Sequence, residues 1–271
     1  MSAPDFRTRR YRIGDLDLLA LVDGHIDMDR DFVGSPQHPT AAWDRYHDDA
    51  GDWTVPVGCF LIPSDPVTLI DLGFGPLADP PPHLSGGRLL GALAEVGFAP
   101  DDIAIVAISH LHSDHIGWIA DAEGAPVFGH ATTVLGRADW DHFVDGSPAE
   151  GAPSDRATSA MRALAVAGRL DLRDGADTPV RPGMRRMAAP GHTPGHAVFA
   201  AHDGTERALL LGDAIHCPAQ LTHTDWDAVT DVDPALARRT RAELARLIDD
   251  DHDTVLGCHF TGLEAGRLLR A

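Results

Sequence analysis

A histidine-rich run at residues 109–115, Ser-His-Leu-His-Ser-Asp-His, constrains this chain more than any other feature. It follows the apolar residues 103–108, a run typical of a buried strand. Such a strand fixes where the next loop begins, so the loop can direct several side chains to one point. Imidazole and carboxylate groups are common metal ligands in proteins. The run therefore predicts a metal site, and its candidate ligands are His110, His112, Asp114 and His115.

Three later segments repeat this pattern, in which a ligand-type side chain follows a short apolar strand. The residues concerned are His192, Asp213 and His259. Glycines next to His192 and Asp213 allow the backbone to approach a metal closely. The chain thus offers seven candidate ligands, which suffice for two cations if one carboxylate bridges them.

The composition argues against several other kinds of site. All 22 cationic residues are arginine, which excludes a Schiff-base lysine and a P-loop lysine. The net charge of -19 argues against a nucleic-acid partner, because phosphate backbones are bound by clustered positive charge. No stretch approaches the ~20 apolar residues of a membrane span, and the N-terminus has no apolar secretion signal. Three widely spaced cysteines disfavour disulfides, so a cytoplasmic protein is expected.

The apolar periodicity predicts strands and helices in alternating blocks. A length of 271 residues fits one domain, residues 1–271. A hairpin is expected over 10–22 and a long loop over 27–53. Further strands are expected at 55–62, 67–70, 103–108, near 127, and at 185–189, 197–201, 208–211 and 254–257. Helices are expected at 87–96, 131–143, 155–167, 234–248 and 263–269. This order predicts an α/β fold of two sheets with helices outside.

The ordered ligand set resembles that of the metallo-β-lactamase superfamily. The His-x-His-x-Asp-His run is followed at increasing distance by His192, Asp213 and His259, and Asp71-Leu72-Gly73 also fits the family pattern. The resemblance implies an αββα sandwich of two mixed sheets with the metals in the cleft at the sheet edges. It also implies the ligand roles: one metal held by His110, His112 and His192, the other by Asp114, His115 and His259, and a bridge from Asp213.

Two segments look most like the branch of quorum-quenching lactonases and methyl parathion hydrolases. They are residues 212–220 and 137–143. Many lactonases place a tyrosine shortly after the bridging aspartate, whereas the third residue after Asp213 here is His216. Its imidazole is a candidate to orient or protonate a substrate oxygen. Two roles are open for Asp71, a structural turn or the orientation of a ligand imidazole, and His196 is expected to be a neighbour of the site or a surface residue rather than a ligand.

The leading hypothesis is a metal-dependent hydrolase that opens lactones or cleaves related esters. A hydroxide bound by two divalent metals would attack the ester carbon, with Asp114 taking the proton and His216 as a second catalytic residue. Zinc is the default metal, and manganese, iron and cobalt suit the same ligands. The expected partner is a small ester, lactone or phosphotriester, with no nucleic acid and no membrane, and the resemblance allows a homodimer. The alternatives are a phosphotriester hydrolase, a thioesterase, a mononuclear iron dioxygenase and a non-catalytic metal-binding or sensor module.

Overall fold

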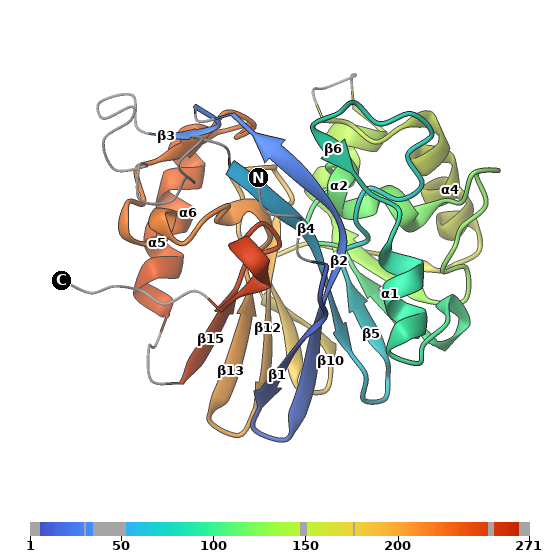
Figure 1. Ribbon diagram of the computed structural model, residues 1–271, viewed down its shortest axis with the longest axis horizontal. Coiled ribbons are helices and arrows are strands. Elements are labelled where there is room, and N and C mark those ends of the chain that lie inside the picture. Colours follow the sequence, from blue (N-terminus) through green and yellow to red (C-terminus); the bar gives the residue numbers. More distant parts are fainter. Residues whose placement is uncertain are drawn as a thin grey trace.

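Two mixed β-sheets lie face to face between two groups of helices (Figure 1). The computed structural model describes residues 6–29, 31–34, 53–146, 151–175, 177–248 and 252–265. In Figure 1, α1 (Leu89–Glu95) and α4 (Asp155–Val166) cover the first sheet, and α5 (Ala219–Thr222) and α6 (Pro234–Leu247) cover the second. This is the αββα sandwich that the family resemblance implies.

The first sheet has the strand order β1-β2-β4-β5-β7-β8-β9, with β6 beside β2. Its first two strands form the predicted hairpin, in which Ile13 pairs with Leu16. Strands β5, β7, β8 and β9 run parallel to one another. The bounds are β1 Arg9–Ile13, β2 Leu16–Met28, β4 Trp53–Ile62, β5 Thr68–Ile70, β6 Leu84–Ser85, β7 Ile105–Ala107, β8 Thr132–Gly136 and β9 Leu170–Arg173.

The second sheet has the order β10-β11-β12-β13-β15. Its strands are antiparallel except for β13 and β15, which are parallel. A separate small sheet pairs β3 with β14. The bounds are β10 Asp177–Arg181, β11 Met184–Ala188, β12 Ala197–Asp203, β13 Glu206–Leu210, β15 Asp253–Leu256, β3 Val33–Gly34 and β14 Asp227–Ala228.

The two long helices begin at the residues that the sequence signals. The Ser154 side chain accepts a hydrogen bond from the Ala157 N–H at the start of α4, and Asp233 does the same for Leu236 at the start of α6. No helix in the described ranges is long and apolar enough to cross a membrane. The shorter helical segments are α2 Ser113–Ile116, α3 Arg137–Asp139 with a π-helical turn Trp140–Val144, and the 3-10 turns Pro100–Asp102, Gly117–Ile119, Gly212–Ala214 and Thr261–Leu263.

Alternation along the strands divides the core into layers. On β2, Leu18, Ala20 and Val22 face the second sheet, whereas Leu19 and Leu21 face the helices. The first set packs against residues of the second sheet, including Phe199 and Leu210. A further cluster joins the outer face of the second sheet to α5 and α6. The strands are therefore apolar on both faces, which a sandwich covered by helices requires.

Several predicted elements were wrong. The helix expected over 131–143 begins only at Arg137, because residues 132–136 form β8, whose Thr-Thr-Val sequence favours a strand. No strand forms at 127; nearby, Ala120 and Pro126 form an isolated bridge. Charge-rich β9 and β10 carried no strand signal. In the expected loop 27–53, Asp27 and Met28 belong to β2, and residues 30 and 35–52 lie outside the described part. Of the helix expected over 263–269, residues 266–269 also lie outside it.

The buried carboxylate of Asp23 anchors the loop that follows β5. A bulge in β2 between Val22 and Gly24 contains this residue. Its Oδ2 accepts hydrogen bonds from the backbone N–H groups of Phe74, Gly75 and Gly87, at 2.8, 3.2 and 3.2 Å. Its Oδ1 accepts from the Leu89 N–H and the Trp118 Nε1–H, each at 2.8 Å. One side chain thus fixes the loop and the start of α1.

We expect Asp23→Ala to lower the free energy of unfolding by at least about 3 kcal/mol, because it leaves several buried N–H donors unpaired. Urea denaturation monitored by circular dichroism measures this loss. Replacing the exposed Asp101 with alanine is the control and should change stability by less than about 0.5 kcal/mol. Equal stability of the two variants would contradict the anchoring role.

Candidate metal centre

The candidate ligands meet where strands of both sheets end. Strands β11, β13 and β15 run in the same direction, because β12 is antiparallel to β11 and β13, and β15 is parallel to β13. Their carboxyl ends therefore share one edge. His192, Asp213 and His259 follow these three ends, and His110 follows the end of β7 in the other sheet.

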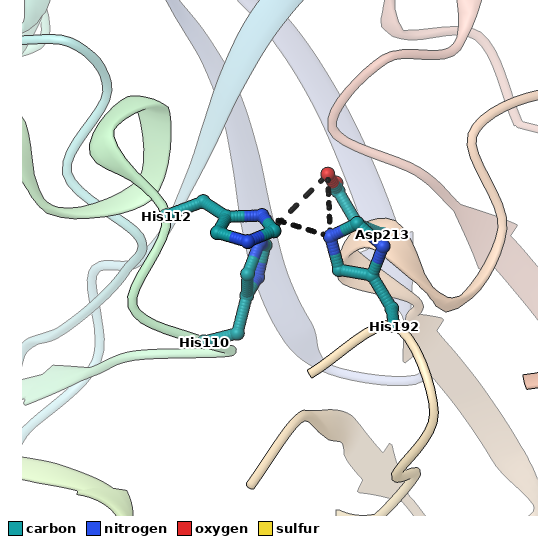
Figure 2. A group of neighbouring side chains, drawn as sticks. All are labelled: His110, His112, His192 and Asp213. Carbon is teal, nitrogen blue, oxygen red and sulfur yellow. Dashed lines mark hydrogen bonds and ion pairs between the residues drawn. The ribbon is translucent and has the colours of Figure 1, made fainter. Parts of the chain in front are cut away.

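The first group of side chains consists of His110, His112, His192 and Asp213. Figure 2 shows these four pointing toward one another from two sides of the centre. His112 Nδ1 lies 3.0 Å from His192 Nε2. Asp213 Oδ2 lies 3.5 Å from His192 Nε2 and 3.8 Å from His110 Nε2. One ligand atom from each residue can thus reach a common point.

The second group lies on the other side of Asp213. Asp213 Oδ1 is 3.2 Å from both His115 Nε2 and His259 Nε2. Asp114 Oδ2 is 3.5 Å from His115 Nε2 and 3.4 Å from His259 Nε2. Cys258, which the sequence did not indicate as a ligand, forms with His115, His259 and Asp213 a set of potential ligand atoms within 4.8 Å of one another, a set that does not include the predicted ligand Asp114. Because its two oxygens face different groups, Asp213 is placed to bridge, as the family resemblance implied.

Four imidazoles are oriented by partners on their outer nitrogen. His110 Nδ1 lies 3.0 Å from Ser109 Oγ, and His115 Nδ1 lies 2.9 Å from Asp71 Oδ2. His192 Nδ1 lies 3.1 Å from Asp231 Oδ1, and His259 Nδ1 lies 2.8 Å from the Pro56 carbonyl oxygen. When Nδ1–H donates to these oxygens, the lone pair is left on Nε2, which points into the centre.

The unpartnered Nε2 lone pairs of the centre are suited to bind divalent cations. Within the described ranges, the Nε2 atoms of His110, His115 and His259 are buried and have no hydrogen-bond partner. Buried polar atoms of this kind are costly unless something binds them. His112 Nδ1 and His192 Nε2 also lie 3.0 Å apart. When neither nitrogen carries a proton, the two cannot form a hydrogen bond with each other. A cation in each group satisfies all of these nitrogens at once.

Burial and charge set the protonation of the centre. Burial lowers the pKa of His112 to about 3 and that of His110 well below its ordinary value, so both are neutral ligands. Burial also opposes the charged form of His115, but Asp213, Asp114 and Asp71 outweigh it and raise the pKa of His115 well above its ordinary value. In Asp213 the imidazoles likewise outweigh burial and hold the pKa of the carboxyl well below its usual range.

Asp71 orients ligands, which was one of its two expected roles. Its Oδ1 accepts the Ser109 N–H at 2.7 Å, and its Oδ2 accepts the Ser109 Oγ–H at 2.8 Å in addition to His115 Nδ1–H. Asp71 has a φ of 57°, in the left-handed region that costs about 1–3 kcal/mol for a residue other than glycine. The carboxylate thereby connects the imidazoles of both groups.

Asp139 holds the two histidine loops together, a role that sequence reasoning missed. This buried carboxylate accepts hydrogen bonds from the Leu111 N–H at 3.2 Å, the Thr193 Oγ–H at 2.9 Å and the Gly195 N–H at 2.5 Å. It therefore fixes the loop of His110 relative to the loop of His192. The only sequence signal was its place in residues 137–143, which resemble the lactonase branch.

His216 lies beside the first group. Its Nε2 is 3.2 Å from Asp213 Oδ2, and the residue is fully buried. Its backbone N–H donates to Gln220 Oε1 at 2.7 Å. The Phe32 ring packs against the imidazole with centroids 5.4 Å apart, and Phe143 packs in the same way on His112 at 5.6 Å. The structure thus places His216 next to Asp213, and its catalytic role stays a prediction.

His196 is a neighbour of the site, as one of its two expected roles implied. His196 is buried, and its Nε2 accepts the Asp213 backbone N–H at 3.0 Å, so it supports the bridging residue. His202 is exposed, and His142 is half-buried against Phe143. Trp53 packs in the core beneath the small sheet.

A fully buried arginine supports His192 from behind. Arg241 on α6 donates through Nη1 to Asp231 Oδ2 at 3.1 Å, and the other oxygen of Asp231 accepts His192 Nδ1–H. Arg241 also pairs with Asp227 at 3.1 Å. This arginine lies far along the chain from His192, so no local pattern indicates the connection.

We expect Arg241→Met to lower the free energy of unfolding by about 3–5 kcal/mol, because it leaves the buried Asp231 carboxylate without its cation. Arg238→Met is the matched control, since Arg238 pairs with the same Asp227 but its side chain is 43% exposed. It should cost about 0–1 kcal/mol. Chemical denaturation of both variants makes the comparison, and similar losses would contradict the support assigned to Arg241.

Known proteins share this fold and parts of the sequence. An N-acyl homoserine lactonase of Bacillus thuringiensis is 24% identical over 173 residues, which are 64% of this chain and 62% of that protein. The chain thus spans about three fifths of the length of the curated relative it matches. Two solved structures have the same architecture at 24% and 22% identity.

The first of these structures is AidC, a dizinc quorum-quenching lactonase in complex with a product; it aligns over 96% of this chain and 92% of that chain with a TM-score of 0.80. The second is the hydrolase AbOPH, which aligns over 99% and 95% with a TM-score of 0.83. The sequence model of the metallo-beta-lactamase superfamily matches residues 52–259, a range that contains every candidate ligand. This chain belongs to the metallo-beta-lactamase superfamily.

Proposed function

We propose that the protein is a metal-dependent hydrolase that opens lactones or cleaves related esters. The observation that carries the proposal is the pair of buried ligand groups that share Asp213. His110, His112 and His192 would hold one divalent cation, and Asp114, His115 and His259 the other. Zinc is the first choice, and manganese, iron and cobalt suit the same nitrogen and oxygen ligands.

Two cations bound here would polarise an ester oxygen and make a water molecule acidic enough to attack near neutral pH. Two aromatic side chains of the protein border the first ligand group. Phe32 and Phe143 pack edge-to-face on the imidazoles of His216 and His112. The AidC structure contains the product N-hexanoyl-L-homoserine, which supports a lactone or ester substrate.

Asp114 is the carboxylate best placed to accept a proton. Its side chain is 14% exposed, whereas that of Asp213 is 6% exposed. Burial would raise the pKa of Asp114, but the imidazoles of His115 and His259 outweigh this effect and hold it well below its usual range. The carboxylate is therefore ionised at neutral pH, as both a metal ligand and a proton acceptor must be.

His216 is proposed to orient the substrate oxygen. Burial lowers the pKa of its imidazole, although Asp213 opposes the shift, so the ring is neutral. We expect His216→Phe to lower kcat on the order of 10²-fold, the range for loss of a positioned acid or base, while both metals remain bound. Steady-state kinetics and elemental analysis on the same sample test this. His202→Ala is the exposed control; a His216→Phe protein with only one metal would assign His216 as a ligand instead.

A substrate panel tests the proposed function. The metal-loaded protein is assayed against acyl-homoserine lactones, simple lactones, aryl esters and phosphotriesters, and its metal content is measured in parallel. Two metals per chain with lactone or ester turnover is the expected result. Two metals without turnover of any member of the panel would contradict a hydrolase and favour a binding or sensor module.

Phosphotriester hydrolysis is the second candidate, because His216 stands where many lactonases have a tyrosine. The same attacking water serves a phosphorus centre as well as an ester carbon. The ratio of kcat/KM for phosphotriesters and lactones decides between them. A ratio well above one would assign the protein to this second class.

A further inference from the structure

Cys258 lies inside the second ligand group. It follows β15, precedes His259 and is only 1% exposed. Its Sγ lies 3.1 Å from Asp213 Oδ1. Ligand atoms of Cys258, His115, His259 and Asp213 all lie within 4.8 Å of one another. A sulfur atom therefore lies close to His115 and His259, whose buried Nε2 atoms have no hydrogen-bond partner.

The other two cysteines lie elsewhere. Cys59 packs in the apolar layer between the first sheet and its helices, and Cys217 packs in the cluster beneath the small sheet. Neither is among the close groups of potential ligands found in the described part of the chain. The parallel pairing of β15 with β13 brings only Cys258 next to Asp213.

We propose that Cys258 is a sulfur ligand of the cation held by His115, His259, Asp114 and Asp213. This inference rests on the two-cation site of the proposed function and deepens it. On binding, the thiol releases its proton to water and the sulfur forms a bond to the cation. Thiolate is a softer ligand than carboxylate and favours zinc or cobalt over manganese. The two cation sites then differ, with nitrogen and oxygen ligands in the first and an added sulfur in the second.

The competing role for Cys258 is a hydrogen bond. A thiol at 3.1 Å from Asp213 Oδ1 can donate its S–H without binding a metal. Serine at this position would keep the hydrogen bond but remove the sulfur. A sulfur-to-metal charge-transfer band therefore separates the two roles, because only a bound thiolate produces it.

The test uses the full chain loaded with Co²⁺ and recorded by absorption spectroscopy. The wild type should bind two Co²⁺ and show a near-ultraviolet sulfur-to-cobalt band. Cys258→Ser should lose the band and bind its second Co²⁺ at least about tenfold more weakly. Tenfold is the lower end of the loss in metal affinity seen when a group that only orients a ligand is removed. Cys217→Ser is the matched control, a buried thiol outside both groups, and should keep the band. In competition titrations, the preference of the second site for Zn²⁺ over Mn²⁺ should fall in Cys258→Ser.

Two results would overturn the proposal. A wild type that binds two Co²⁺ without the band, or a Cys258→Ser protein that keeps it, would leave Cys258 as a hydrogen-bond donor and leave the proposed hydrolase intact. A wild type that binds no Co²⁺ and no Zn²⁺ would overturn the proposed function as well. Cys258→Ala, checked by circular dichroism, provides a second variant if serine disturbs the apolar packing around the sulfur.

Discussion

Replacing Asp213 with alanine should abolish metal loading and turnover together. Asp213 is the residue shared by both ligand groups, with one oxygen facing each. Its loss removes the bridge and the negative charge that offsets two cations. We expect kcat/KM to fall by at least ~10³-fold, because metal assistance contributes several kcal/mol to the barrier and each 1.36 kcal/mol is a factor of ten in rate. Elemental analysis of the purified variant should find fewer than two metals per chain.

Asp101→Ala controls for the loss of a carboxylate elsewhere, since Asp101 is exposed. It should retain both metals and full activity. Circular dichroism and thermal melting establish that the Asp213 variant is folded. A folded Asp213→Ala protein with normal turnover would remove the basis for a shared two-metal centre.

Removing the metals should lower thermal stability by roughly 10 °C. Cations bind only the folded chain, and a site filled at 1,000 times its dissociation constant adds about 4 kcal/mol. One kcal/mol shifts Tm by about 2–4 °C in a chain of this size. Differential scanning calorimetry with a chelator, followed by return of zinc, measures the loss and its reversal. The chelator should have little effect on Asp213→Ala, which serves as the control.

This loss should grow as the pH rises above about 7, where histidines of ordinary pKa are already mostly neutral in the unfolded chain and the lowered pKa values of His110 and His112 no longer change stability with pH. In the metal-free protein, the pKa values of His115 and His259 are raised well above the ordinary value of histidine, although burial alone would lower both. For His115, the nearby Asp213, Asp114 and Asp71 outweigh burial. For His259, Cys258 and Asp213 do so. A raised folded-state pKa contributes stability below the unfolded pKa, and this contribution disappears as the pH rises through the folded value. Calorimetry of the chelated protein across this range should show a falling Tm, and a Tm that rises with pH would contradict the assignment.

The candidate ligands could be chosen from the sequence because they are carried by local patterns. A strand followed by histidine or aspartate occurs four times, and each time the side chain lies at a strand end. The hairpin at Ile13 and Leu16 and the helices starting after Ser154 and Asp233 were predictable for the same reason. Alternation, turns and caps depend on a few neighbouring residues.

The residues around the ligands could not be predicted in this way. Asp139, Asp231 and Arg241 look like ordinary charged residues of helices and loops, yet they are buried against the histidine loops. The misread helix over 131–143 has the same origin, because Thr132–Gly136 becomes a strand through parallel pairing with β7 and β9. Such roles depend on partners distant in sequence.

The sequence by itself determined which groups of this protein are suited to bind metal, since imidazole and carboxylate chemistry and their placement after apolar strands are local properties. Only the tertiary structure decided that Asp213 divides its two oxygens between the groups, that Asp71 and Asp231 orient imidazoles, and that Cys258 joins the second group. The physical reason is that strand order and direction in two packed sheets set the distances between these atoms, and no local pattern in the chain encodes that order.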